Sequence, residues 1–159
     1  MPTPVQNTQI RNATTGFQTV RASTATGNTP LAASATTIFT VASGRIFIIS
    51  LVGQVTTVIQ GQATTVQFIS SSSAGTAVNL TNSTGDLNGK EVGATVTLAT
   101  TLGGTAVVNN AGATVCANPR FLVPAGNITV TMGAASTGAL KYELIWVAYD
   151  SGATVTAGA

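Results

Sequence analysis

Short runs with the period of a β-strand recur along most of this chain, and this pattern constrains its fold more than any other feature. Residues 127–132 alternate hydrophobic and polar without a break, and residues 37–42, 63–69 and 93–98 show a similar texture. Turns rich in Gly and Pro separate the runs at spacings of about ten residues, whereas helical periodicity of more than two turns is absent. The sequence therefore predicts an all-β fold, specifically an antiparallel β-sandwich of jelly-roll type.

One central run is more hydrophobic than its neighbours. Residues 45–53 are almost continuously apolar and rich in β-branched side chains, which predicts a strand buried on both faces. Residues 54–59 continue this strand, and we expect a bend at Gly53 between the two parts.

The last long run, residues 140–149, places Tyr142, Leu144 and Trp146 on one face of a strand. Packing inside the sandwich is the simpler interpretation of these aromatic side chains. A sugar-binding platform is the alternative.

The texture of the sequence divides the chain into three parts. Residues 1–34 contain few bulky hydrophobic side chains and are predicted to form an extended N-terminal arm, residues 35–152 the β-sandwich domain, and residues 153–159 a C-terminal tail. Residues 16–22 are the part of the arm that we expect to add a strand to a neighbouring sheet.

Charged residues make up only 6% of the chain, where about 25% is typical. The polar surface must therefore consist mainly of Thr, Ser, Asn and Gln. A neutral surface of this kind leaves sheet edges poorly protected against association, so we favour a surface covered by neighbouring subunits over a neutral monomer. The net charge of +2 comes from scattered residues rather than a basic stripe, and nucleic-acid binding is not predicted.

A single cysteine, Cys116, allows no intrachain disulfide and is predicted to be a small buried side chain, with an intermolecular disulfide as the alternative. The N-terminal residues lack an apolar signal core, and the longest apolar run is too short to cross a bilayer. We expect a protein that is made in a cytoplasm and is not a membrane protein.

The sequence offers little for chemistry. It contains no histidine, the usual proton carrier of acid–base catalysis. Asp86 and Glu91 are close in sequence, but a solvated turn with a local contact between Lys90 and Glu91 explains them better than catalysis or calcium binding does. We therefore predict no enzyme, with no catalytic residue, cofactor or metal ligand.

Two groups of segments resemble a known family. They are residues 121–131 with 136–142 and 145–150, and the earlier residues 38–41 leading into 44–48. Together they resemble the β-sandwich decoration (cement) proteins of tailed-bacteriophage capsids. The resemblance implies homotrimers on the capsid exterior of the virion, with the major capsid protein as partner and a role in stabilising the head.

Inter-subunit contacts are expected from the arm and from arginines at strand starts. The candidates are Arg11, Phe17, Val20, Arg21, Arg45 and Arg120. Two other functions remain open: another phage structural module, such as a collar, tail or fibre subunit, and a glycan- or receptor-binding β-sandwich.

Overall fold

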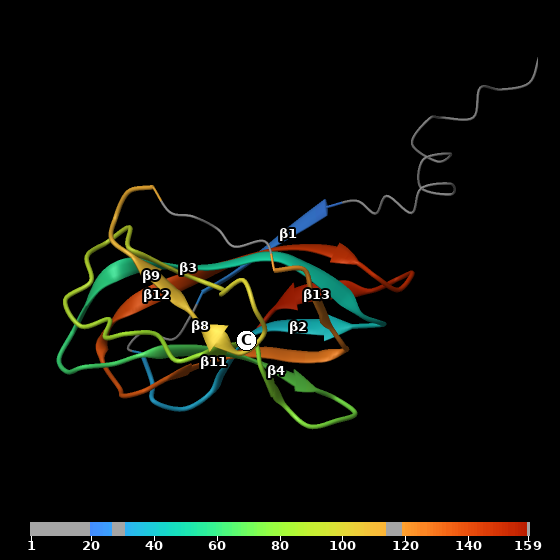
Figure 1. Ribbon diagram of the computed structural model, residues 1–159, viewed down its shortest axis with the longest axis horizontal. Helices are drawn as coiled ribbons and strands as arrows, with labels where there is room; N and C mark the ends of the chain where they lie inside the picture. The colour runs from blue at the N-terminus through green and yellow to red at the C-terminus, as the bar shows by residue number, and fades with distance from the viewer. Residues whose placement is uncertain (1–19, 27–30, 114–118, 159) are drawn as a thin grey trace, which may run out of the picture.

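Two sheets packed face to face form the protein (Figure 1). The computed structural model describes residues 20–26, 31–113 and 119–158. Every element in this part of the chain is a strand, and both main sheets are antiparallel. The prediction of an all-β antiparallel sandwich is confirmed, whereas the jelly-roll topology and the extended arm stay predictions.

The first sheet is built around its two longest strands, which pair with each other along most of their length. In spatial order it contains β1 (Val20–Thr26), β12 (Thr137–Ala148), β3 (Ile46–Gln60), β7 (Thr95–Thr97) and β9 (Val107–Asn109), with β10 (Phe121–Val123) also paired to β3.

The second sheet joins strands from both halves of the chain. Its order is β13 (Thr154–Ala157), β2 (Thr36–Ala42), β11 (Gly126–Met132), β4 (Val66–Ser72) and β5 (Val78–Asn79). A small parallel pair, β6 (Thr81–Asn82) with β8 (Gly104–Thr105), lies beside the main sheets.

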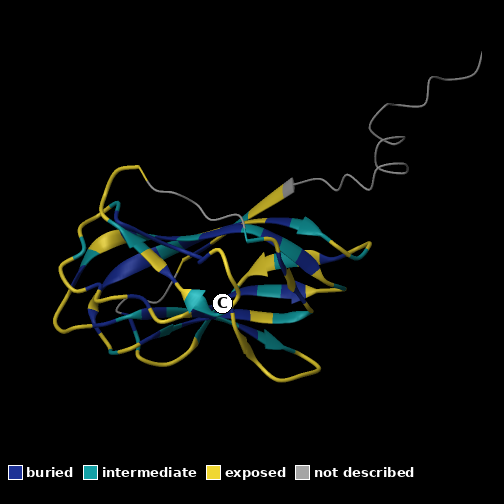
Figure 2. Ribbon diagram, viewed as in Figure 1, coloured by how far each residue is buried: buried dark blue, intermediate teal, exposed yellow. Residues whose placement is uncertain are grey.

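The core lies between the two inner faces, where every second residue of the long strands is buried (Figure 2). Tyr142, Leu144 and Trp146 all point inward from β12 and are almost fully buried, which confirms the core interpretation of these side chains. The ring of Tyr142 meets the ring of Phe68 edge to face, with ring centroids 6.1 Å apart, so the two sheets are joined by an aromatic contact.

The prediction that residues 45–53 are buried on both faces is wrong. Phe47, Ile49 and Val52 of β3 are only partly buried, because the outer face of the first sheet is open at this end. The strand also continues without a break to Gln60. The expected bend at Gly53 stays a prediction. Gly53 has a packing role, because a Cβ there would lie 3.1 Å from Cε1 of the buried Tyr142 ring.

The sandwich also includes strands beyond the predicted range 35–152. At the N-terminal side, β1 pairs with β12 of the same chain, so residues 20–22 extend their own sheet rather than a neighbour's. At the C-terminal side, β13 pairs with β2. The two added strands are in contact with each other at one edge of the sandwich. Residues 16–19 and Cys116 lie outside the described residues.

Trp146 explains why the polar strand β1 belongs to the sheet. The indole Nε1 of Trp146 donates a hydrogen bond of 3.1 Å to Oγ of Ser23, and the guanidinium of Arg21 lies 5.2 Å from the centre of the indole ring. Strand β1 therefore covers an aromatic side chain that would otherwise be exposed at the sheet edge.

Candidate interaction surface

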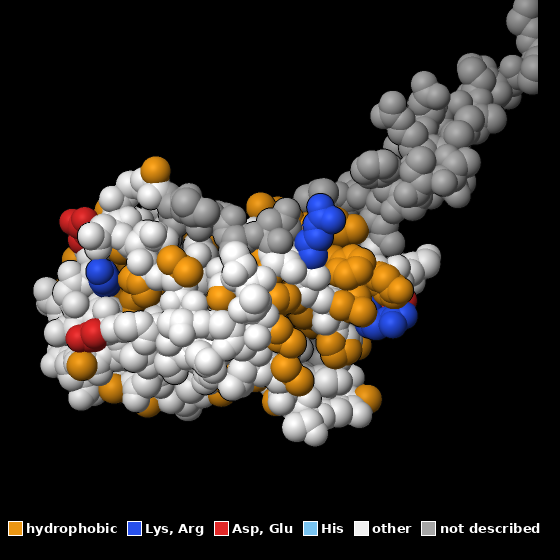
Figure 3. All heavy atoms as spheres, viewed as in Figure 1, with side chains coloured by type: hydrophobic (Ala, Val, Ile, Leu, Met, Phe, Trp, Pro, Cys, Tyr) orange, Lys and Arg blue, Asp and Glu red, His pale blue; other side chains and the backbone are white. Residues whose placement is uncertain are grey.

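An exposed hydrophobic surface covers one end of the first sheet. Phe47 of β3 pairs with Leu122 of β10 on one side and with Val147 of β12 on the other, and directly paired residues of an antiparallel sheet point to the same face. We call this surface the apolar face, and its residues are Phe47, Ile49, Leu122, Ile145, Val147 and Tyr149. Figure 3 shows hydrophobic side chains gathered at one end of the molecule, next to basic side chains.

The hydrophobic side chains of the apolar face are exposed next to one another. Leu122, Ile145 and Tyr149 are 45%, 39% and 44% exposed, and Phe47, Ile49 and Val147 are partly exposed beside them. A contiguous apolar patch of this kind is typical of a surface that another molecule covers.

A hollow of about 230 Å³ lies within the apolar face, and Phe47, Ile49, Val147 and Arg120 line it. Arg120 adopts a left-handed backbone conformation with φ of 51°, which costs a non-glycine residue about 1 kcal/mol or more. Its exposed side chain has no ion-pair or hydrogen-bond partner among the described residues. A cation without a partner therefore stands at the rim of an apolar hollow.

Arg45 is held differently at the edge of the same face. Its guanidinium donates two hydrogen bonds to Asp150, of 2.8 Å from Nε to Oδ2 and 2.9 Å from the terminal nitrogen to Oδ1. It also stacks on the ring of Tyr149, which in turn meets Phe47 edge to face. These hydrogen bonds from Arg45 lower the pKa of the Asp150 carboxyl to about 2.

The structure places the predicted contact residues in three groups. Arg45 and Arg120 border the apolar face, whereas Arg21 lies over Trp146 at the edge of the sandwich. Val20 belongs to β1, but its side chain is outside the described part, as are Arg11 and Phe17. The sequence therefore located the arginines of the surface but not its hydrophobic centre.

One cause explains why the sequence does not predict the hydrophobic residues of the apolar face. Residues 46–52 of β3 are apolar at every position except Ser50, so their pattern does not distinguish the inner face from the outer one. Only the register with β10 and β12 shows that Phe47 and its neighbours share an outer face.

The loop of residues 83–93 lies at the opposite end of β3. Oδ1 of Asp86 accepts hydrogen bonds of 2.9 Å from the amides of Thr64 and Asn88, which lower the pKa of this carboxyl and fix an Asx turn. The expected contact between Lys90 and Glu91 is wrong, because Nζ of Lys90 donates instead to Oδ1 of Asn110 at 2.9 Å.

Glu91 and Val92 of this loop are both exposed to solvent. Glu91 is exposed and has no ion-pair or hydrogen-bond partner for its side chain in the described part of the chain, and Val92 is 56% exposed. The loop presents a carboxylate directly beside an exposed aliphatic side chain.

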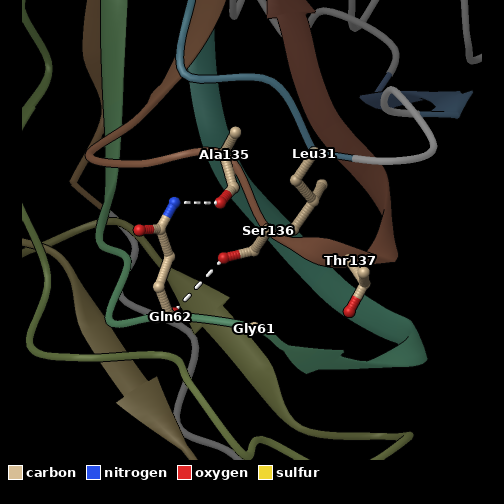
Figure 4. Close-up of a pocket in the computed structure, with 6 residues that line it drawn as sticks. All are labelled: Leu31, Gly61, Gln62, Ala135, Ser136 and Thr137. Atoms are coloured by element: carbon tan, nitrogen blue, oxygen red, sulfur yellow. Dashed lines mark hydrogen bonds between the residues drawn. The ribbon is translucent and has the colours of Figure 1, made fainter.

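A second hollow, of about 360 Å³, is lined by Leu31, Gly61, Gln62 and residues 135–137 (Figure 4). Its polar groups already bond to one another: Nε2 of Gln62 donates to the carbonyl of Ala135, and the hydroxyl of Ser136 donates to the carbonyl of Gln62. This hollow therefore offers few free groups to a ligand.

The described residues contain no group of three or more acidic or cysteine side chains placed to hold a metal ion. They also contain no helix long and apolar enough to cross a membrane. In comparisons with known proteins, no family model matches this chain, and no curated protein or solved structure matches it significantly.

Proposed function

We propose that this chain is a non-catalytic virion structural protein that decorates and stabilises a bacteriophage capsid as a homotrimer bound to the major capsid protein. The observation that carries the proposal is the apolar face, an exposed hydrophobic surface on a sandwich whose remaining surface is largely neutral. A cement protein gains affinity from many weak contacts repeated over a symmetric shell, and an exposed apolar patch can supply such contacts. The resemblance of residues 38–41, 44–48, 121–131, 136–142 and 145–150 to decoration proteins supplies the capsid as the partner.

Binding to undecorated head shells tests this proposal. We expect the purified protein to cosediment with the shells of its parent phage, and a variant with both Leu122→Lys and Ile145→Lys to lose most of this binding, because each substitution places a charge in the apolar contact. Val107→Lys is the matched control, since Val107 is also exposed but lies on β9, away from the apolar face. Absence of cosedimentation by the unmodified protein would contradict the capsid role.

A collar, tail or fibre module with the same fold would use the same apolar face on a different partner. Immunogold labelling of whole virions separates these locations, and label confined to the tail would replace the capsid proposal with this alternative.

Glycan binding is less well supported, because Tyr142 and Trp146 lie in the core and leave Tyr149 as the exposed aromatic side chain of β12 and its following turn.

A further inference from the structure

Two charged side chains stand out among the described residues because they lack an intramolecular partner. Most charged side chains have a partner within the molecule. Two ion pairs join Arg45 to Asp150 and Lys141 to Glu143, and Lys90 donates a hydrogen bond to Asn110. Asp86 accepts hydrogen bonds from backbone amides, and Arg21 stacks on Trp146. Arg120 and Glu91 alone have no such interaction in the described part, and their charges are opposite.

Both unpaired charges also stand beside complementary hydrophobic features. Arg120 is at the rim of the hollow lined by Phe47, Ile49 and Val147, whereas Glu91 precedes the exposed Val92. The hollow of about 230 Å³ has room for an aliphatic side chain, since a water molecule occupies about 30 Å³. One surface is a cationic hollow and the other an anionic projection.

The two surfaces lie at opposite ends of β3, so they cannot meet within one molecule. Arg120 precedes Phe121, which pairs with Ile48, and the carbonyl of Lys90, next to Glu91, accepts a hydrogen bond from the amide of Ile59. The distance along β3 from Ile48 to Ile59 is on the order of 36 Å, at roughly 3.3 Å per residue.

We propose that these surfaces join two copies of this chain, with Glu91 of one copy paired to Arg120 of the next and Val92 inserted into the hollow. The contact is head to tail, because it joins two different surfaces, and it satisfies every copy only in a closed assembly. The inference rests on the proposed assembly role and deepens it, since it names the residues that hold the homotrimer together. The next copy fills only the hollow of the apolar face, and the exposed Leu122 and Ile145, which do not line the hollow, remain for the shell. Arg120 lines the hollow and holds a left-handed backbone conformation there.

A charge swap tests the contact with the full-length protein in solution. We expect light scattering of the unmodified protein to show a discrete oligomer. Either Arg120→Glu or Glu91→Arg should raise the dissociation constant of this oligomer by about tenfold or more, because each single change places like charges together. The double variant Arg120→Glu with Glu91→Arg should restore association. Lys141→Glu is the matched control, because it makes the same change of charge at an exposed site outside the proposed contact.

Circular dichroism of each variant shows whether it is folded, and Val92→Ser provides a neutral test of the same contact should a charge reversal disturb the fold. A monomer at all concentrations, or single variants that associate as well as the unmodified protein, would overturn the proposal.

Shell binding is measured separately. A monomer that binds shells overturns this contact and leaves the capsid role, whereas an oligomer that obeys the charge swap but ignores shells supports the contact and removes the capsid role.

Discussion

At the scale of single residues, Gly53 and Tyr142 show how closely the core is packed. A Cβ at position 53 would lie only 3.1 Å from Cε1 of the Tyr142 ring, which also meets the ring of Phe68 edge to face. The Tyr142 hydroxyl is buried without a hydrogen-bond partner among the described residues, and burial raises its pKa. Two substitutions measure separately how the packing of this ring and how its buried hydroxyl affect the stability of the fold.

The first is Gly53→Ala, which we expect to destabilise the fold by about 1–3 kcal/mol, because the buried ring has little room to move. Urea denaturation measures the effect. Gly85→Ala is the control, since no atom lies within 4 Å of a Cβ at that position, and it should be close to neutral. Equal effects of the two substitutions would contradict the packing role of Gly53.

The second is Tyr142→Phe, which keeps the ring and removes the unpaired hydroxyl. We expect the free energy of unfolding to stay the same or to rise by about 1 kcal/mol, because a buried polar group without a partner is unfavourable. Denaturation in urea is again the measurement, and a clear loss of stability would show that the hydroxyl has a partner such as bound water.

The pairing of Arg45 with Asp150 makes a prediction about pH. Because the pKa of Asp150 is lowered in the folded protein to about 2, this carboxylate stabilises the fold above its unfolded pKa of about 3.9, and the contribution is lost as the pH falls towards 2. Asp150→Asn should therefore lower the melting temperature at neutral pH and have little effect near pH 2. Glu143→Gln serves as the control, because it removes only a single 3.2 Å contact between the exposed side chains of Lys141 and Glu143 and should have a much smaller effect. A constant difference across this pH range would refute the assignment.

At the scale of strands, the sequence predicts best where one face of a strand is buried and the other is polar. Residues 127–132 alternate cleanly and form most of β11, and Pro124 follows directly after β10. Strands β1 and β13 were assigned to an arm and a tail because they consist largely of small and polar residues. Their place in the sheets depends on pairing with β12 and β2, distant segments that no local pattern reveals.

Truncation tests the role of β1. A variant that begins at Val20 should keep the strand and its stability, whereas one that begins at Leu31 loses the cover of Trp146 and the hydrogen bond from its indole to Ser23. Because Trp146 is the only tryptophan of the chain, its fluorescence reports the change directly. We expect a shift of emission to longer wavelength and a lower melting temperature for the shorter variant alone. Unchanged fluorescence would mean that other residues cover the indole.

At the scale of the whole molecule, the apolar face and the loop of residues 83–93 lie at opposite ends of β3 and give the protein two unlike ends. The sequence predicted a surface made for neighbours from its lack of charge, but the positions of these ends follow only from the fold. The attraction between Arg120 of one copy and Glu91 of the next depends on the ionic strength.

Association through Arg120 and Glu91 should therefore weaken with salt. Charges at the rim of a contact are screened over a Debye length, which is about 10 Å at 0.1 M and about 3 Å at 1 M salt. Sedimentation velocity across this range should show a rising dissociation constant for the unmodified protein. The variant Val92→Ser with Glu91→Gln, which lacks the charge, should show little dependence on salt, and equal dependence in both would point to other charged contacts.

The contact between β1 and β13 brings the two ends of the folded domain to one edge of the sandwich. A short flexible linker from Ala157 to Val20 could therefore close the chain, and new termini could open in the exposed turn of residues 73–77 between β4 and β5. Such a circular permutant would keep every strand pairing of both sheets. It would also move the chain ends to the other side of the molecule, where a fused peptide could be displayed without disturbing β1.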